Sequence, residues 1–94
     1  SFFWQDPRVL RYGIAENLYG HEDIATFRRS RTTVAARTLH NTTIMTYGAH
    51  YGTANTEFRH EGDPRIGRQT QTWVRMADGW QIVAAHVSWL AERE

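Results

Sequence analysis

The sequence predicts an α+β domain in which one helix packs on a strongly curved antiparallel sheet. A single helical segment, about residues 21–31, has acidic residues in its first turn and arginines in its last, as the helix dipole favours. Long segments rich in threonine, β-branched and aromatic residues follow it and are typical of strands. Short turn sequences separate these strands, so neighbours along the chain are expected to pair as an antiparallel meander.

The first third of the chain contains one predicted strand and the helix. Asp6-Pro7 interrupts the extended start, and residues 8–14 alternate as a strand does. The sequence AENLYG, residues 15–20, is interpreted as a turn. Ile24 and Phe27 are spaced to share one face of the helix that follows.

Four strands are predicted in the remainder of the chain. TTVAA, residues 32–36, connects the helix to them. Their predicted ranges are 37–47, 53–60, 65–76 and 80–90. Residues 48–52 and 61–64 form the first two turns, and Asp78-Gly79 suits a two-residue hairpin loop of the primed type.

Length and composition indicate a single domain over residues 1–94. A chain of this size buries roughly 60–65% of its unfolded surface. Its aromatics, four each of Trp, Tyr and Phe, are many for one small core, which favours a homodimer or a higher homo-oligomer. The sequence has no cysteine and no lysine, which excludes disulfides, thiolate chemistry and lysine Schiff bases.

Several functional classes are not supported by the sequence. The net charge of +1 argues against a nucleic-acid partner. No apolar run approaches the ~20 residues of a membrane span, and no signal peptide opens the chain, so we expect a cytoplasmic protein without a membrane partner. The five histidines are scattered, and neither a phosphate loop nor a nucleophile elbow occurs. We therefore expect neither a metal nor a cofactor.

The segment RIGRQTQTWV, residues 65–74, is unusual for a strand because its middle is polar on both faces. A two-residue loop at Asp78-Gly79 predicts four cross-strand pairs in the last hairpin: Gln71 with His86, Gln69 with Ser88, Trp73 with Ala84, and Arg75 with Ile82. Such a face combines a polar cluster with an apolar patch, as pocket walls do. Arg68 and the threonines are left for the other face. Glu57, on the preceding strand, faces either Arg68 or Gln69, depending on a one-residue choice of register.

Two motifs carry a family resemblance. RYGxxENLYG, starting at Arg11, and RIGRQxQTWVR, starting at Arg65, make the chain resemble the AtzH-like family of the nuclear transport factor 2-like (SnoaL-like) superfamily. The resemblance implies a cone-shaped sheet around a pocket, and dimers. Relatives include an oxalurate-catabolism protein and an amidohydrolase acting on dicarboxyurea. Family members begin with helices before the segment equivalent to FFWQDP, so we expect this domain to be short at its N-terminus.

Four residues are candidates for substrate binding. Arg11 either grips a substrate carboxylate in bidentate fashion or pairs with Glu16. Gln69 and Gln71 have amides that donate and accept hydrogen bonds, which suits a ureide, although a solvated strand face explains them as well. Trp73 is expected in the pocket wall.

Arg11, Glu57 and His86 are the candidate catalytic residues. Glu57 is either a general base in the cone or a structural ion-pair partner of Arg68 or Arg59. His86 is the group most suited to titrate near neutral pH, although a histidine between apolar neighbours is often structural.

Together these features predict a pocket for a small carboxylate-bearing molecule. The resemblance implies an amidohydrolase acting on a carboxylated ureide such as dicarboxyurea or an oxalurate-like acid. The alternative is a non-catalytic module that binds a metabolite or supports a partner amidase by oligomerisation.

Overall fold

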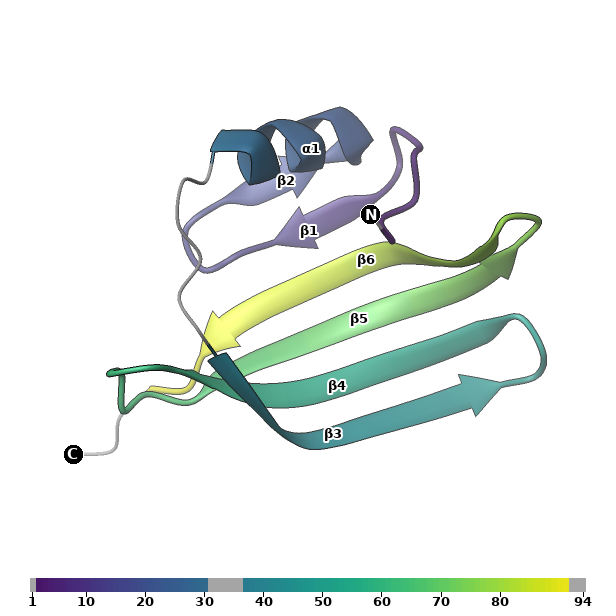
Figure 1. The fold of residues 1–94 in the computed structure, drawn as a ribbon. Coiled ribbons are helices and arrows are strands. Elements are labelled where there is room, and N and C mark those ends of the chain that lie inside the picture. Colours follow the sequence, from purple (N-terminus) through teal and green to yellow (C-terminus); the bar gives the residue numbers. More distant parts are fainter. Residues whose placement is uncertain (1, 31–36, 92–94) are drawn as a thin grey trace.

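The computed structural model of the chain describes residues 2–30 and 37–91 (Figure 1). The helix α1 spans Gly20–Ser30. The six strands are β1 (Leu10–Tyr12), β2 (Asn17–Tyr19), β3 (Arg37–Tyr47), β4 (Tyr51–His60), β5 (Gly67–Met76) and β6 (Gly79–Trp89). At 11 residues, α1 is too short to cross a membrane, and no other helix occurs in the described ranges.

The strands form one curved, unclosed sheet in the order β2-β1-β6-β5-β4-β3. The predicted antiparallel meander is confirmed for β3 to β6, and β1 pairs with β2 in antiparallel fashion too; the sheet is mixed because β1 and β6 run parallel. Residues 17–19, predicted within a turn, instead form β2 and pair with β1. The hairpin of β1 and β2 pairs through β1 with the edge of β6. This pairing joins segments far apart in the sequence, so the periodicity of local sequence could not predict it.

The remaining element boundaries agree with the sequence prediction to within two residues, except that β1 spans only Leu10–Tyr12 instead of the predicted residues 8–14. Strand β3 has the predicted range, whereas α1 begins one residue early and β4 two residues early. The helix has Glu22 and Asp23 in its first turn and Arg28 and Arg29 in its last. The predicted connector 32–36 and the predicted helix end at Arg31 lie outside the described residues.

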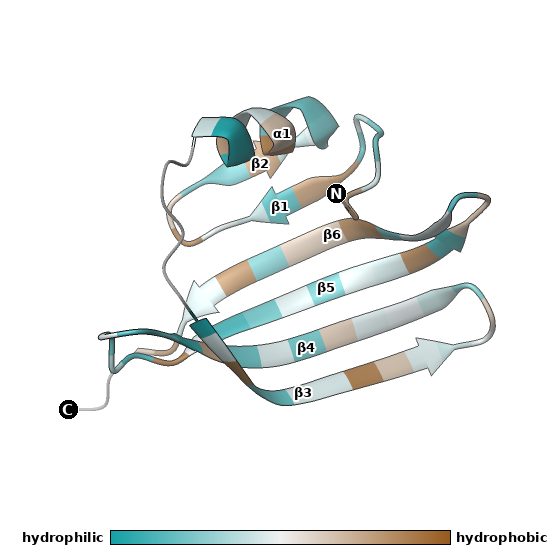
Figure 2. Cartoon of the chain, in the orientation of Figure 1, coloured by the Kyte–Doolittle hydropathy of each residue, from teal (hydrophilic) through white to brown (hydrophobic). Residues whose placement is uncertain are grey.

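A small apolar core lies between α1 and the β1–β6 half of the sheet. Its buried members are Phe3, Val9, Ile24, Ile82 and Ala85. The chain start adds to it by pairing with β6, because the Trp4 amide donates to the Ile82 carbonyl at 2.9 Å and the Ile82 amide donates to the Phe2 carbonyl at 2.7 Å. In Figure 2, β4 and β5 are pale to teal along much of their length, so the core does not extend evenly over the sheet.

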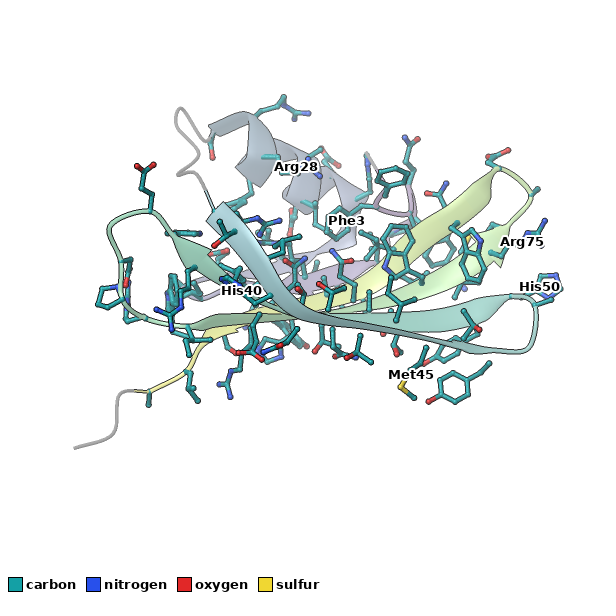
Figure 3. The ribbon with its side chains drawn as sticks, turned by 60° about the horizontal axis from the view of Figure 1, so that its bottom comes forward. Phe3, Arg28, His40, Met45, His50 and Arg75 are labelled. Atoms are coloured by element: carbon teal, nitrogen blue, oxygen red, sulfur yellow. The ribbon has the colours of Figure 1, made fainter. Side chains whose placement is uncertain are left out.

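The two faces of the sheet differ in what covers them. We call the side on which α1 packs the helix face and the opposite side the outer face. Figure 3 shows Phe3 between α1 and the sheet, and Met45 on the outer face. The first part of β3 rises toward the helix face in the same view, which curves the sheet around that side.

A bulge in β3 permits this bend. The register between β3 and β4 shifts between His40 and Thr43. Asn41, within the shift, has a φ of 49°, a left-handed conformation that asparagine tolerates better than most residues. Bulges of this kind bend a strand locally and redirect its side chains.

Candidate functional site

The helix face contains a hollow over β3, β4 and β5, beyond the helix-covered core. Its volume is about 160 Å³. The lining residues are Arg37, Leu39, Thr42, Ala54, Thr56, Gln69 and Gln71. We call it the helix-face hollow. It lies on the face of the sheet that carries Gln69 and Gln71.

Both glutamine amides make directed contacts there. The Trp73 indole Nε1–H donates to Gln71 Oε1 at 3.1 Å. Arg37 Nη1–H donates to Gln69 Oε1 at 3.4 Å, from a strand 32 residues earlier in the sequence. Each amide therefore has its oxygen engaged by a group that can only donate.

Two threonines at the same hollow bond to each other and to the backbone. The hydroxyls of Thr42 and Thr56 lie 2.8 Å apart, and the Thr56 hydroxyl reaches the His40 carbonyl at 3.2 Å. These contacts tie β3 to β4 beside its bulge. The hydroxyls are thus largely satisfied by the protein itself.

Arg11 also lies on the helix face, where it forms the ion pair weighed from the sequence. Its Nη1 donates to Glu16 Oε1 at 3.0 Å, and the two side chains are only 18% and 26% exposed. Its guanidinium carbon lies 5.5 Å from the centre of the Phe27 ring on α1. A Cβ atom at Gly13 would collide with the Glu16 carboxylate, so this glycine of the RYG motif makes room for the pair.

The structure places His86 on the outer face, and the predicted pairing of Gln71 with His86 is wrong. Gln71 lies opposite Ala85, and His86 lies opposite Thr70. The loop comprises residues 77–78, one residue earlier than predicted. This change alone would move the partner of every β5 residue by two positions along β6, so each side chain would stay on its predicted face. A bulge at Val83 then adds one residue to β6, and this odd shift moves His86 to the opposite face.

The other predicted pairs of the hairpin change with it. Gln69 lies opposite Val87 rather than Ser88, and Trp73 opposite Ile82 rather than Ala84. Gln69, Gln71 and Trp73 nevertheless share one face, as predicted, because they alternate along a regular strand. On the outer face the His86 ring contacts the Tyr12 ring, with centroids 5.8 Å apart.

Glu57 lies on the outer face as well, opposite Arg68 rather than Gln69. Its carboxylate Oε2 accepts a hydrogen bond from Asn41 Nδ2 at 2.8 Å. Within the described part of the chain it forms no ion pair with Arg68 or Arg59. The structure therefore brings Arg11, Gln69, Gln71 and Trp73 to the helix face and separates Glu57 and His86 from them.

The sequence analysis missed Arg37 as a site residue. It lines the helix-face hollow, and its guanidinium carbon lies 5.5 Å from the centre of the buried Phe58 ring. The position follows the connector and precedes a strand, so local sequence gave no sign that it would reach β5. A second hollow of about 250 Å³, at the ends of β3 and β4, also includes Arg37, together with Thr38, Arg59, His60 and Glu61. Its lining mixes both charges and contains none of the predicted site residues.

Beyond that second hollow, one carboxylate has a strongly shifted pKa. Hydrogen bonds from the Arg65 side chain and backbone to Asp63 lower the pKa of that carboxyl to about 2. The shortest contact, Arg65 Nη2 to Asp63 Oδ2, is 2.7 Å. The pair lies in the turn between β4 and β5 and supports that turn rather than the helix-face hollow. Across residues 2–30 and 37–91, no group of three or more histidine or acidic side chains is arranged to hold a metal.

Comparison with solved structures reveals close relatives. A protein of unknown function of the DUF3225 family from Pectobacterium atrosepticum is 52% identical, with a TM-score of 0.92, over 96% of this chain and 71% of that chain. A cystatin-like fold protein from Burkholderia xenovorans is 46% identical, with a TM-score of 0.91, over 98% and 74%.

A more distant relative shows the fold alone. A nuclear transport factor 2-like superfamily protein from Salmonella enterica is 24% identical, with a TM-score of 0.76, over 99% of this chain and 75% of that one. No curated protein matches the chain. The family model described as AtzH-like matches residues 1–93. The chain therefore belongs to the AtzH-like family and has the nuclear transport factor 2-like fold.

Proposed function

We propose that the protein binds a small carboxylate-bearing molecule in the helix-face hollow. The observation that carries this proposal is the joint placement of Gln69, Gln71 and Arg37 around one cavity. A guanidinium beside amide groups suits a ligand that has both a carboxylate and carbonyl groups. The family and fold support a small-molecule pocket protein in general.

Arg11 is the second cation on the same face. It lies in register with Ala85, which in turn lies opposite Gln71, so Arg11 and Gln71 are two strands apart in one row. Strand spacing puts their backbones about 10 Å apart, with only a small alanine side chain between them. A ligand anchored at Arg37 and extending along this row would approach Arg11, whose charge is already balanced by Glu16.

Hydrolysis of a carboxylated ureide, such as dicarboxyurea or an oxalurate-like acid, is the second candidate. The observation in its favour is Glu16, a carboxylate on the helix face in contact with Arg11. The proton-transfer roles predicted for Glu57 and His86 remain predictions, and both residues lie on the outer face. Their placement favours binding over hydrolysis at the helix-face hollow.

Oxalurate provides a test of both candidates. We expect it to raise the melting temperature of the purified chain, because a ligand that binds only the native state stabilises that state. An Arg37→Met variant should lose this shift, and a Glu57→Gln variant should keep it. Release of urea and oxalate would establish hydrolysis, whereas stabilisation without products would establish binding alone. Absence of any shift at millimolar oxalurate and malonate would refute the proposed function.

We also propose a homodimer formed through the outer face. Met45, Tyr47 and Tyr51 are 46%, 55% and 42% exposed there. Light scattering should give twice the chain mass, and Met45→Glu should halve it by placing a charge in the interface. A monomeric wild-type protein at high micromolar concentration would contradict this proposal.

A further inference from the structure

We infer that Trp73 sets the ligand selectivity of the helix-face hollow by fixing the Gln71 amide with its N–H groups available to the ligand. The inference rests on the proposed function and deepens it. Trp73 acts through Gln71 and is therefore a positioning residue. The ligand class it selects is one that offers hydrogen-bond acceptors, namely carboxylates, in preference to primary amides.

The direction of the Gln71 amide follows from what an indole can do. An indole N–H donates and never accepts, so the Gln71 atom 3.1 Å from Trp73 Nε1 must be the carbonyl oxygen. The two hydrogens of Nε2 are then the donors left for a ligand. A free glutamine amide would rotate to offer either its oxygen or its nitrogen, whereas this one has a preferred direction.

Packing holds the indole in place. Trp73 packs against the buried core cluster, and its ring centroid lies 5.6 Å from that of Phe2. Its cross-strand neighbour is Ile82, which is 4% exposed. Rotation of the indole would disturb these contacts, so the donor that orients Gln71 is itself anchored.

Gln69 is oriented by the same logic. Arg37 has only donors, and its Nη1 contacts Gln69 Oε1. The Thr56 hydroxyl donates to the His40 carbonyl and therefore accepts from Thr42, so both hydroxyl hydrogens are used within the protein and the Thr42 oxygen remains as one acceptor. The two amides and the guanidinium thus direct mainly N–H groups toward a ligand. A ligand NH₂ group would find few acceptors and would lose hydrogen bonds that it makes in water.

A matched ligand series tests the inference by calorimetric titration. Malonate has two carboxylates, malonamate has one carboxylate and one amide, and malonamide has two amides. We expect wild-type affinity to fall in that order. In the Trp73→Phe variant the Gln71 amide is free to rotate. We therefore expect this variant to bind malonamide about five- to tenfold more tightly than wild type does, and its affinity for malonate to differ from that of wild type by less than about threefold. An unchanged malonate-to-malonamide ratio would overturn the inference.

Two further variants separate orientation from a general effect on folding. Gln71→Glu keeps an acceptor for the indole but removes the amide donors. It should therefore lower the affinity for malonate at least tenfold, while its melting temperature should stay within about 3 °C of that of wild type. Retained malonate affinity in this variant would overturn the inference even if Trp73→Phe failed to fold. In a Gln71→Met background, Trp73→Phe should no longer change the ratio of the affinities for malonate and malonamide, because there is no amide left to orient.

The same titrations keep the two proposals distinguishable. If wild type prefers malonate and Trp73→Phe leaves that preference unaltered, the binding site stands and the positioning role of Trp73 falls. If none of the three ligands binds and oxalurate gives no thermal shift, the proposed function falls, and the inference falls with it.

Discussion

Replacement of Gly67 by alanine should destabilise the domain through one steric conflict. Gly67 lies in β5 between Phe58 of β4 and Trp89 of β6. A Cβ atom at this position would occupy space held by the Phe58 ring. Phe58 is 2% exposed, and its ring centroid lies 5.4 Å from that of Trp89 and 5.3 Å from that of His60. The ring cannot move aside without losing these contacts.

The size of the effect follows from the two terms involved. Overpacking a close-packed site destabilises by about 1–3 kcal/mol, and loss of aromatic contacts adds about 0.5–1.5 kcal/mol. We expect Gly67→Ala to reduce the free energy of unfolding by about 2–4 kcal/mol. For a domain of this size, this corresponds to a fall in melting temperature of about 10–25 °C.

Urea denaturation followed by tryptophan fluorescence measures this loss, and a double-mutant cycle identifies its cause. In a Phe58→Leu background, the smaller side chain leaves room for the new methyl group, so Gly67→Ala should be at least about 1 kcal/mol less destabilising there. A loss below about 0.5 kcal/mol in the wild-type background, or an equal loss in both backgrounds, would refute the steric argument.

Three further predictions concern individual side chains. Arg37→Ala should lower the affinity for malonate at least tenfold, since hydrogen bonds to charged groups contribute about 1.5–3 kcal/mol. Calorimetric titration measures this affinity, and an unchanged value would show that Arg37 does not bind the ligand. Glu57→Gln should leave malonate affinity within twofold, because Glu57 lies on the outer face; a large loss would place the ligand there instead. Asp63→Asn removes a carboxylate whose pKa is lowered to about 2 by Arg65. Because the native pKa lies below the ordinary value of 3.8, the pair contributes stability above about pH 4 and loses it as the pH falls through about 2. Urea midpoints of wild type and Asp63→Asn should therefore differ at pH 6 and converge near pH 2; a constant difference would contradict this linkage.

The long strands and the helix could be predicted because their local sequence and their tertiary setting agree. Residues 37–47 combine threonines with β-branched and aromatic side chains, and they form a strand over that range. The helix has the charge pattern that its dipole favours, and Ile24 is buried in the core. Strand β2 was missed because three residues after a turn carry little local signal, and its pairing with β1 stabilises it.

The faces of the last two strands could be predicted only up to the first irregularity. Alternation correctly grouped Gln69, Gln71 and Trp73, because β5 is regular over that segment. It failed for His86 because Val83 adds one residue to β6, and an added residue exchanges the faces of every position beyond it. Neither valine nor its neighbours signal a bulge, so the error could not be found without the pairing itself.

That one bulge also bears on which function the site supports. With a regular β6, His86 would lie on the helix face opposite Gln69, and the hollow would contain an imidazole next to amide donors. With the bulge, His86 contacts Tyr12 on the outer face, and the hollow keeps two oriented amides and a guanidinium. Amides and guanidinium groups recognise acceptors but transfer no protons near neutral pH. The register of one hairpin therefore supports the proposed binding role of this hollow, and Glu16 beside Arg11 is the carboxylate on which the proposed hydrolysis rests.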